Sequence, residues 1–278
     1  MILDLKVQIE RMTWPEVEET IGESKGIVLV PVGAVEEHGP HLPLGTDSIE
    51  TYEIGLRAAR QAKVPIAPLI WFGNSRSFMD FPGTVAIKPE TLKLYTRDVL
   101  LSLIQHGFTR PIILDGHGGN YGILDVLIED IMLERGVKIF HVRSWELATL
   151  SKPKEIPAYD GHGGSSETSV MLYLCPDDVN KDRFVDSKPD IDLTQYGAVF
   201  PEPSSLFSKG PAKYPLMMGE MVSAGHHGAP SFGSPERGEA LIEVKVNALV
   251  EFITALKNDR IRVRQDRESP TGLEKPHG

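Results

Sequence analysis

The chain of 278 residues has a single cysteine and no long apolar segment. Cys175 has no second cysteine with which to form an intramolecular disulfide bond. No stretch contains the about eighteen consecutive apolar residues of a membrane-spanning helix, and no signal-peptide pattern is present. These absences predict a protein of the cytoplasm.

Basic residues are also scarce relative to acidic ones. The chain has 29 Lys and Arg against 39 Asp and Glu, which gives a formal net charge of -10. This balance disfavours binding to nucleic acids or to anionic membranes. We therefore expect a small-molecule substrate that is neutral, cationic or bound through a metal ion, with no nucleic-acid or membrane partner.

Short apolar runs alternate with segments of helical spacing. The expected strands are residues 26–31, 64–71, 111–114 and 138–143, and the longer expected helices are residues 47–60, 89–107, 124–136 and 235–258. This order predicts an α/β fold with a mainly parallel sheet flanked by helices. No internal repeat or linker is apparent, so we expect one domain over residues 1–278, with a polar tail from about residue 259.

Histidines are concentrated in loops rich in glycine or proline. Six of the nine lie there: His38, His41, His117, His162, His226 and His227. In an open parallel sheet, loops that follow strands meet at one edge, where ligands bind. Several of these loops are therefore expected to converge on one crevice.

The loop over residues 32–47 contains five potential metal ligands, among them Glu36, His38 and Asp47. Residues two apart in an extended segment point the same way, so Glu36 and His38 could each contact a metal ion. Asp47, at the next helix start, could bridge two ions. The alternative is an Asp N-cap with surface Glu and His on a turn.

Two later loops offer partners. His117 lies between glycines that let the backbone approach a ligand, and Asp115 could orient its imidazole. His162 could act as a general acid or base, with Glu167 as a further carboxylate ligand. The alternatives are a glycine turn at His117, and a solvent-exposed His162 beside a helix-capping Glu167.

These motifs resemble those of the creatininase (creatinine amidohydrolase) family. The match rests on residues 36–47, 81–84, 115–120 and 162–169. The resemblance implies an α/β fold around a parallel sheet, a hydrolytic site with two divalent metal ions (Zn, Mn or Fe) and a homohexamer.

The same resemblance implies roles for individual residues. Glu36 and His117 would bind one metal ion, His38 would bind the other, and Asp47 would bridge them. His162 would be the catalytic histidine that transfers a proton.

The chain departs from the family pattern at three positions. Creatininases have a glutamate ligand where this chain has Gly119, and we expect Glu167 to replace it. They also have a tryptophan where this chain has Ala158, and many relatives have a histidine near Phe78. Creatinine itself is therefore not singled out as the substrate.

The leading hypothesis is a metal-dependent hydrolase that cleaves a C–N amide bond of a small cyclic amide or formamide, with a metal-bound hydroxide as nucleophile. Alternatives within the family are cleavage of a peptide terminus, of an oxidised inositol ring at a C–C bond, or of a formylaminopyrimidine. An alternative of another class is a protein that binds a small ligand or metal without turnover.

Overall fold

The computed structural model describes residues 2–4, 6–147, 154, 156–157, 160–190 and 215–259. Within them, three parallel strands form a sheet in the order β1-β2-β3. The strands are β1 (Ile27–Val32), β2 (Arg110–Asp115) and β3 (Phe140–Arg143). The chain reaches each next strand through helices, as parallel pairing requires.

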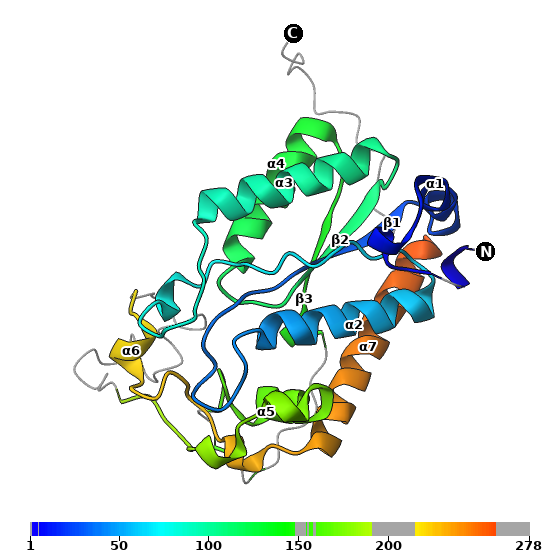
Figure 1. Ribbon diagram of the computed structural model, residues 1–278. Helices are drawn as coiled ribbons and strands as arrows, with labels where there is room; N and C mark the ends of the chain where they lie inside the picture. Colours follow the sequence, from blue (N-terminus) through cyan, green and yellow to red (C-terminus); the bar gives the residue numbers. More distant parts are fainter. Residues whose placement is uncertain are drawn as a thin grey trace.

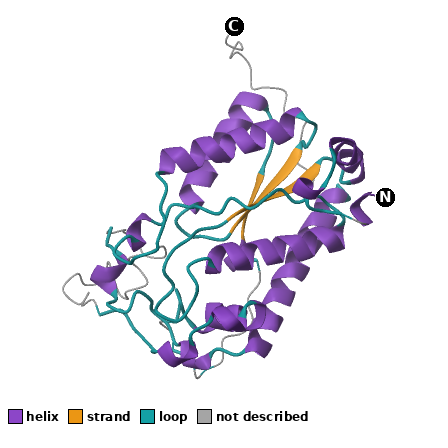
Figure 2. Cartoon of the chain, viewed as in Figure 1, coloured by secondary structure: helices purple, strands orange, loops and turns teal. Residues whose placement is uncertain are grey.

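Helices cover both faces of this sheet (Figures 1 and 2). One face packs against α3 (Pro89–Gln105) and α4 (Tyr121–Arg135), and the other against α2 (Thr46–Ala62), α5 (Ser165–Leu174) and α7 (Pro235–Lys257). Side chains along β1 alternate between the two cores, with Ile27 and Leu29 in one and Val28 and Val30 in the other. The predicted α/β fold with a parallel sheet is confirmed.

Smaller helices complete the described structure. They are α1 (Trp14–Glu23), α6 (Met218–Met221) and the 3₁₀ turns Ile2–Asp4, Ile9–Arg11, Arg76–Phe78, Ser144–Glu146, Pro176–Asp178, Lys181–Arg183 and Pro230–Phe232. Thr13 and Glu16 form a capping box at α1. None of the helices in the described ranges combines the length and apolar character needed to cross a membrane.

The prediction of a regular strand over residues 64–71 is wrong. This segment runs beside β1 but makes only isolated parallel bridges: Ile66 bridges to Leu29 and to Gln8, and Ile70 bridges to Val32. Pro65 and Pro68 have no backbone N–H, so a continuous ladder of hydrogen bonds cannot form. Residues 191–214 and the polar tail beyond residue 259 lie outside the described residues, as does Ala158.

Candidate metal centre

The candidate ligands come from four segments that meet beyond the carboxyl ends of the strands. Glu36 and His38 lie in the loop after β1, Asp47 lies in the first turn of α2, and His117 lies in the loop after β2. Glu167 lies in the first turn of α5. The predicted convergence of loops is thus present, at the edge of the sheet where α/β proteins bind ligands.

Glu36, Asp47 and His117 form one group whose potential ligand atoms lie within 4.8 Å of one another. His117 Nε2 is 3.2 Å from Glu36 Oε2, and His117 Nδ1 is 3.1 Å from Asp47 Oδ2. All three residues are buried. Because Gly45 is the N-cap of α2, the alternative of Asp47 as N-cap is wrong.

His38, Asp47 and Glu167 form a second group within the same limit. His38 Nε2 is 3.1 Å from Asp47 Oδ1 and 3.9 Å from Glu167 Oε2. The other ring nitrogen of His38, Nδ1, donates a hydrogen bond to the backbone carbonyl of Glu36 at 3.1 Å. Asp47 therefore presents one carboxylate oxygen to each group.

The donor set fits divalent cations. Glu36 Oε2 and Asp47 Oδ2 are buried without a hydrogen-bond partner, and a buried carboxylate oxygen needs a proton donor or a cation. Burial opposes the charge on His38, but Asp47 outweighs it and raises the pKa of His38 to about 10. Burial likewise opposes ionisation of Asp47, but His38 and His117 lower its pKa. The cluster therefore favours positive charge between its carboxylates.

Position 119 has no room for a side chain in this conformation. A Cβ atom at Gly119 would lie 2.3 Å from the backbone oxygen of Asn74 and 2.4 Å from His117 Nε2. Asn74 is fixed there, because its Nδ2 donates to the Gly119 carbonyl at 2.9 Å. The carboxylate that reaches the second group belongs to Glu167, whose Oε2 also accepts a hydrogen bond from the backbone N–H of Gly163 at 2.6 Å.

His162 lies beside both groups, and one of its ring nitrogens also lies within 4.8 Å of potential ligand atoms of Glu36 and His38. Its Nε2 donates to the backbone carbonyl of Glu37 at 2.8 Å, which assigns the proton to Nε2, and its Nδ1 lies 3.9 Å from Glu36 Oε1. The ring centroid of His162 is 4.3 Å from that of His38 and 4.7 Å from that of Phe78. Its side chain is only 14% exposed, so the alternative of a solvent-exposed histidine is wrong. Burial lowers the pKa of His162 to about 3, so the ring is neutral.

Three further neighbours of the centre have no role assigned from the sequence. Glu37 is buried, with Oε1 at 3.4 Å from His162 Nε2, and burial raises the pKa of Glu37 to about 7. Phe78 packs on His162, and the Asn74 carbonyl lies 3.2 Å from His117 Nε2. The sequence signals were the place of Glu37 among the potential ligands of the first loop and the departure from the family pattern near Phe78.

The remaining loop histidines have structural contacts. His41 Nε2 lies 3.0 Å from Thr168 Oγ1, and His226 Nε2 donates to the Val185 carbonyl at 2.8 Å. The backbone N–H of His227 donates to the His162 carbonyl at 3.1 Å, which ties the loop at residues 225–228 to the loop that carries His162. They support the centre without entering its ligand groups.

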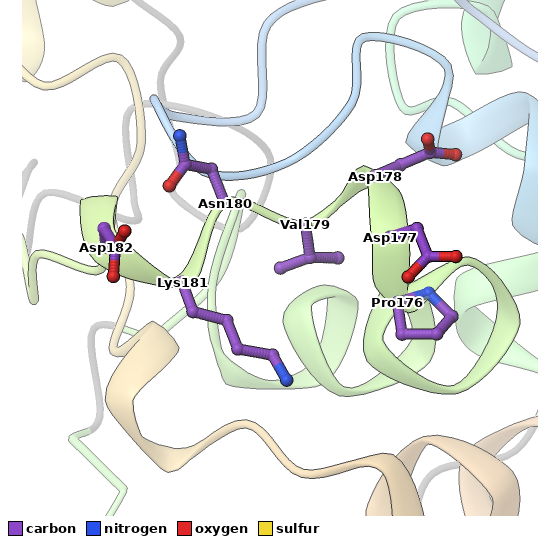
Figure 3. A pocket seen from close by; sticks show the side chains of 7 residues that line it. All are labelled: Pro176, Asp177, Asp178, Val179, Asn180, Lys181 and Asp182. Carbon is purple, nitrogen blue, oxygen red and sulfur yellow. The ribbon is translucent and has the colours of Figure 1, made fainter.

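A separate hollow of about 490 Å³ lies along residues 176–182 (Figure 3). Consecutive residues of one segment line it, and none of the candidate ligands is among them. This hollow is a surface feature apart from the metal centre.

Comparisons with known proteins connect this geometry to a family. A family model described as creatininase, creatinine amidohydrolase, matches residues 10–253. The creatinine amidohydrolase of Pseudomonas putida is 28% identical over 265 residues, which cover 89% of this chain and 96% of that relative. The mycofactocin precursor peptide peptidase of Mycolicibacterium smegmatis is 33% identical over 171 residues, which cover 57% of this chain and 62% of that relative.

A solved structure of the manganese form of a creatininase has the same fold. The two superpose with a TM-score of 0.75 at 24% identity, over 90% of this chain and 98% of the creatininase chain. Since the family model spans most of the sequence, the chain belongs to the creatininase (creatinine amidohydrolase) family of metal-dependent amidohydrolases.

Proposed function

We propose that the chain is a hydrolase with two divalent metal ions that cleaves a C–N amide bond of a small cyclic amide or formamide. The observation that supports this best is the pair of ligand groups that share Asp47: one with Glu36 and His117, the other with His38 and Glu167. Imidazole with carboxylate ligands suits Zn, Mn or Fe. Two such ions lower the pKa of a water molecule and polarise a carbonyl group.

The protein residues have distinct roles in this proposal. Glu36, His38, Asp47, His117 and Glu167 hold the ions. His162 keeps a proton on Nε2, where the Glu37 carbonyl accepts it, and its Nδ1 faces the ligand groups. This neutral ring can accept at Nδ1 the proton that the attacking water loses and transfer it to the leaving nitrogen of the substrate as the C–N bond breaks.

The creatinine amidohydrolase of Pseudomonas putida supports the choice of a small cyclic amide, because its similarity extends over nearly the whole of both chains. A peptide amide is the second candidate, supported by the 33% identity to the mycobacterial peptidase. We further propose that the chain acts as one domain in a cytoplasmic homohexamer.

The test is metal analysis of the purified protein combined with hydrolysis assays on cyclic amides, formamides and short peptides. The His162→Ala variant should retain its metal ions but lose turnover by about 10²- to 10⁴-fold. The Glu53→Gln variant in α2, which loses only a partly exposed ion pair with Arg57, is the control and should keep full activity. A protein without bound metal, whose thermal stability and activity do not respond to added Mn²⁺ or Zn²⁺, would contradict the proposal.

A further inference from the structure

His141, a histidine outside the metal centre, contacts two carboxylates with its two ring nitrogens. Nδ1 lies 2.7 Å from Asp125 Oδ1 and Nε2 lies 3.2 Å from Asp115 Oδ2. The side chain of His141 is 4% exposed and Asp115 is fully buried, whereas the Asp125 side chain is 45% exposed. Because carboxylates accept and do not donate, this geometry favours a proton on each ring nitrogen.

Asp115 connects this histidine to the loop that carries His117. Its other oxygen, Oδ1, accepts hydrogen bonds from the backbone N–H of His117 and from Asn120 Nδ2, both at 3.1 Å. The expected contact between Asp115 and the His117 imidazole is thus replaced by a contact with the His117 backbone. Asn120 in turn accepts from the Asn74 N–H at 2.9 Å. The carboxylate therefore holds the loop over residues 116–120 at two points.

Sheet geometry explains why these groups meet. His141 pairs with Ile113 across β2 and β3, so its side chain shares a face with Ile113 and, two residues on, with Asp115. That face is covered by α4, which carries Asp125 and begins after Asn120 (Figure 1). The histidine thus lies between the end of β2 and the first turns of α4.

We propose that His141 is a positioning residue for the metal centre: it fixes Asp115, and Asp115 fixes the loop that places His117 against Glu36 and Asp47. Without protonated His141, the buried Asp115 carboxylate would change its rotamer or draw water to the carboxyl end of β2. The His117 backbone would then lose its anchor. This role rests on the proposed function, since it concerns the ligand His117.

The test compares variants on the metal-free full chain titrated with Mn²⁺. His141→Ala should weaken binding by about 10- to 100-fold, as the loss of residues that orient a metal ligand does in other sites. His141→Gln should lie between His141→Ala and wild type, because its amide can still donate to Asp115. Val142→Ala, on the same strand, is the matched control for lost packing, and Asp125→Asn tests the exposed partner; both should keep the wild-type affinity.

A spectroscopic readout separates positioning from stability. With Co²⁺ in place of Mn²⁺, the visible absorption spectrum should change in His141→Ala and not in Val142→Ala, even if both lower the unfolding temperature equally. Wild-type affinity and spectrum in His141→Ala would overturn the positioning role. A wild-type protein that binds no Mn²⁺ or Co²⁺ would instead overturn the proposed function, and the role of His141 with it.

Discussion

The Asp47 carboxylate contacts a histidine of each ligand group. Its Oδ1 faces His38 and its Oδ2 faces His117, in both cases at 3.1 Å. A buried carboxylate is costly unless charge and hydrogen bonds offset its desolvation. Here imidazoles from two different loops do so, and the same oxygens lie where each of two ions would bind. The two halves of the site are therefore coupled through one residue.

Alanine substitutions at Gly119 and Gly118 test how tightly the backbone packs around His117. A Cβ atom at Gly119 would meet Asn74 and His117, whereas one at Gly118 meets nothing within 4 Å. Gly119→Ala should therefore displace His117, weaken metal binding and cost about 1–3 kcal/mol of stability. Gly118→Ala should have little effect. Metal titration and thermal unfolding of both variants check this, and equal metal affinity in the two would contradict it.

The protonation of His141 predicts a pH dependence of stability. Burial opposes its charge, but Asp115 and Asp125 outweigh this and raise the pKa of His141. Folding then favours the protonated ring, so the stabilisation is complete below the unfolded-state pKa of about 6.5 and is lost as the pH rises through the folded-state pKa. In urea unfolding of the metal-free protein, the free energy of unfolding of wild type should exceed that of His141→Gln, and this difference should be largest at low pH. A difference that grows as the pH rises would contradict this.

The site could be predicted from the sequence only where the residue type itself signals chemistry. Histidines and carboxylates among glycines, such as His117 and Glu167, are visible along the chain. Asn74 is not, because its backbone carbonyl has no chemical signature until folding brings it to His117. Phe78 is visible only as a departure from the family pattern, and its packing on His162 is known only from the structure. His141 was missed for a different reason: it lies within a strand, and its two aspartates are 16 and 26 residues away along the chain.

At the scale of elements, α5 is held by its packing against α7. Gly238 of α7 lies so close to α5 that a Cβ atom there would be 2.0 Å from the Ser169 carbonyl oxygen and 2.9 Å from Tyr173 Cβ. Because α5 carries Glu167 in its first turn, this close approach also sets where the carboxylate lies. The second ligand group thus depends on a helix–helix contact outside the site.

Two glycine substitutions test that dependence. Gly238→Ala should force α7 away from α5 and destabilise the fold by about 1–3 kcal/mol. Gly22→Ala in α1 meets nothing within 4 Å and should be stabilising by up to about 1 kcal/mol, because alanine is the better helix former. Thermal unfolding compares the two, and a stabilising Gly238→Ala would show that the helices are not in close contact.

The helices were more predictable than the edge of the sheet. The Ser234 cap accepts from the Arg237 N–H at the start of α7, as Ser followed by Pro indicates. The segment over residues 64–71 has strand-like composition, but strand pairing depends on backbone donors that its prolines lack. The apolar pattern therefore predicted that this segment packs beside the sheet, but it did not predict which backbone hydrogen bonds the segment makes.

At the scale of the whole molecule, the sheet brings together ligands that are far apart in the sequence. Glu36 and Glu167 are 131 positions apart, in the loop after β1 and in the first turn of α5. Alternation of strands and helices predicted a common edge for their loops, and the family resemblance predicted how the ligands divide around Asp47. The structure adds the distances, with one Asp47 oxygen facing each group.

Metal binding should also stabilise the folded chain as a whole, because the ligand groups form only on folding. At an ion concentration of about 100 times the dissociation constant, the gain is about 2.7 kcal/mol for one site. Thermal unfolding before and after removal of metal with a chelator measures it. An unfolding temperature independent of Mn²⁺ and Zn²⁺ would contradict coupling between the site and the fold.

The most direct test of the central claim is the number of ions bound per chain, measured by elemental analysis after metal loading and dialysis. Two coupled groups predict two ions in the wild-type protein, one in Glu167→Gln and none retained in Asp47→Asn. One ion in the wild-type protein, or equal numbers in wild type and Asp47→Asn, would contradict a centre with two ions that share Asp47.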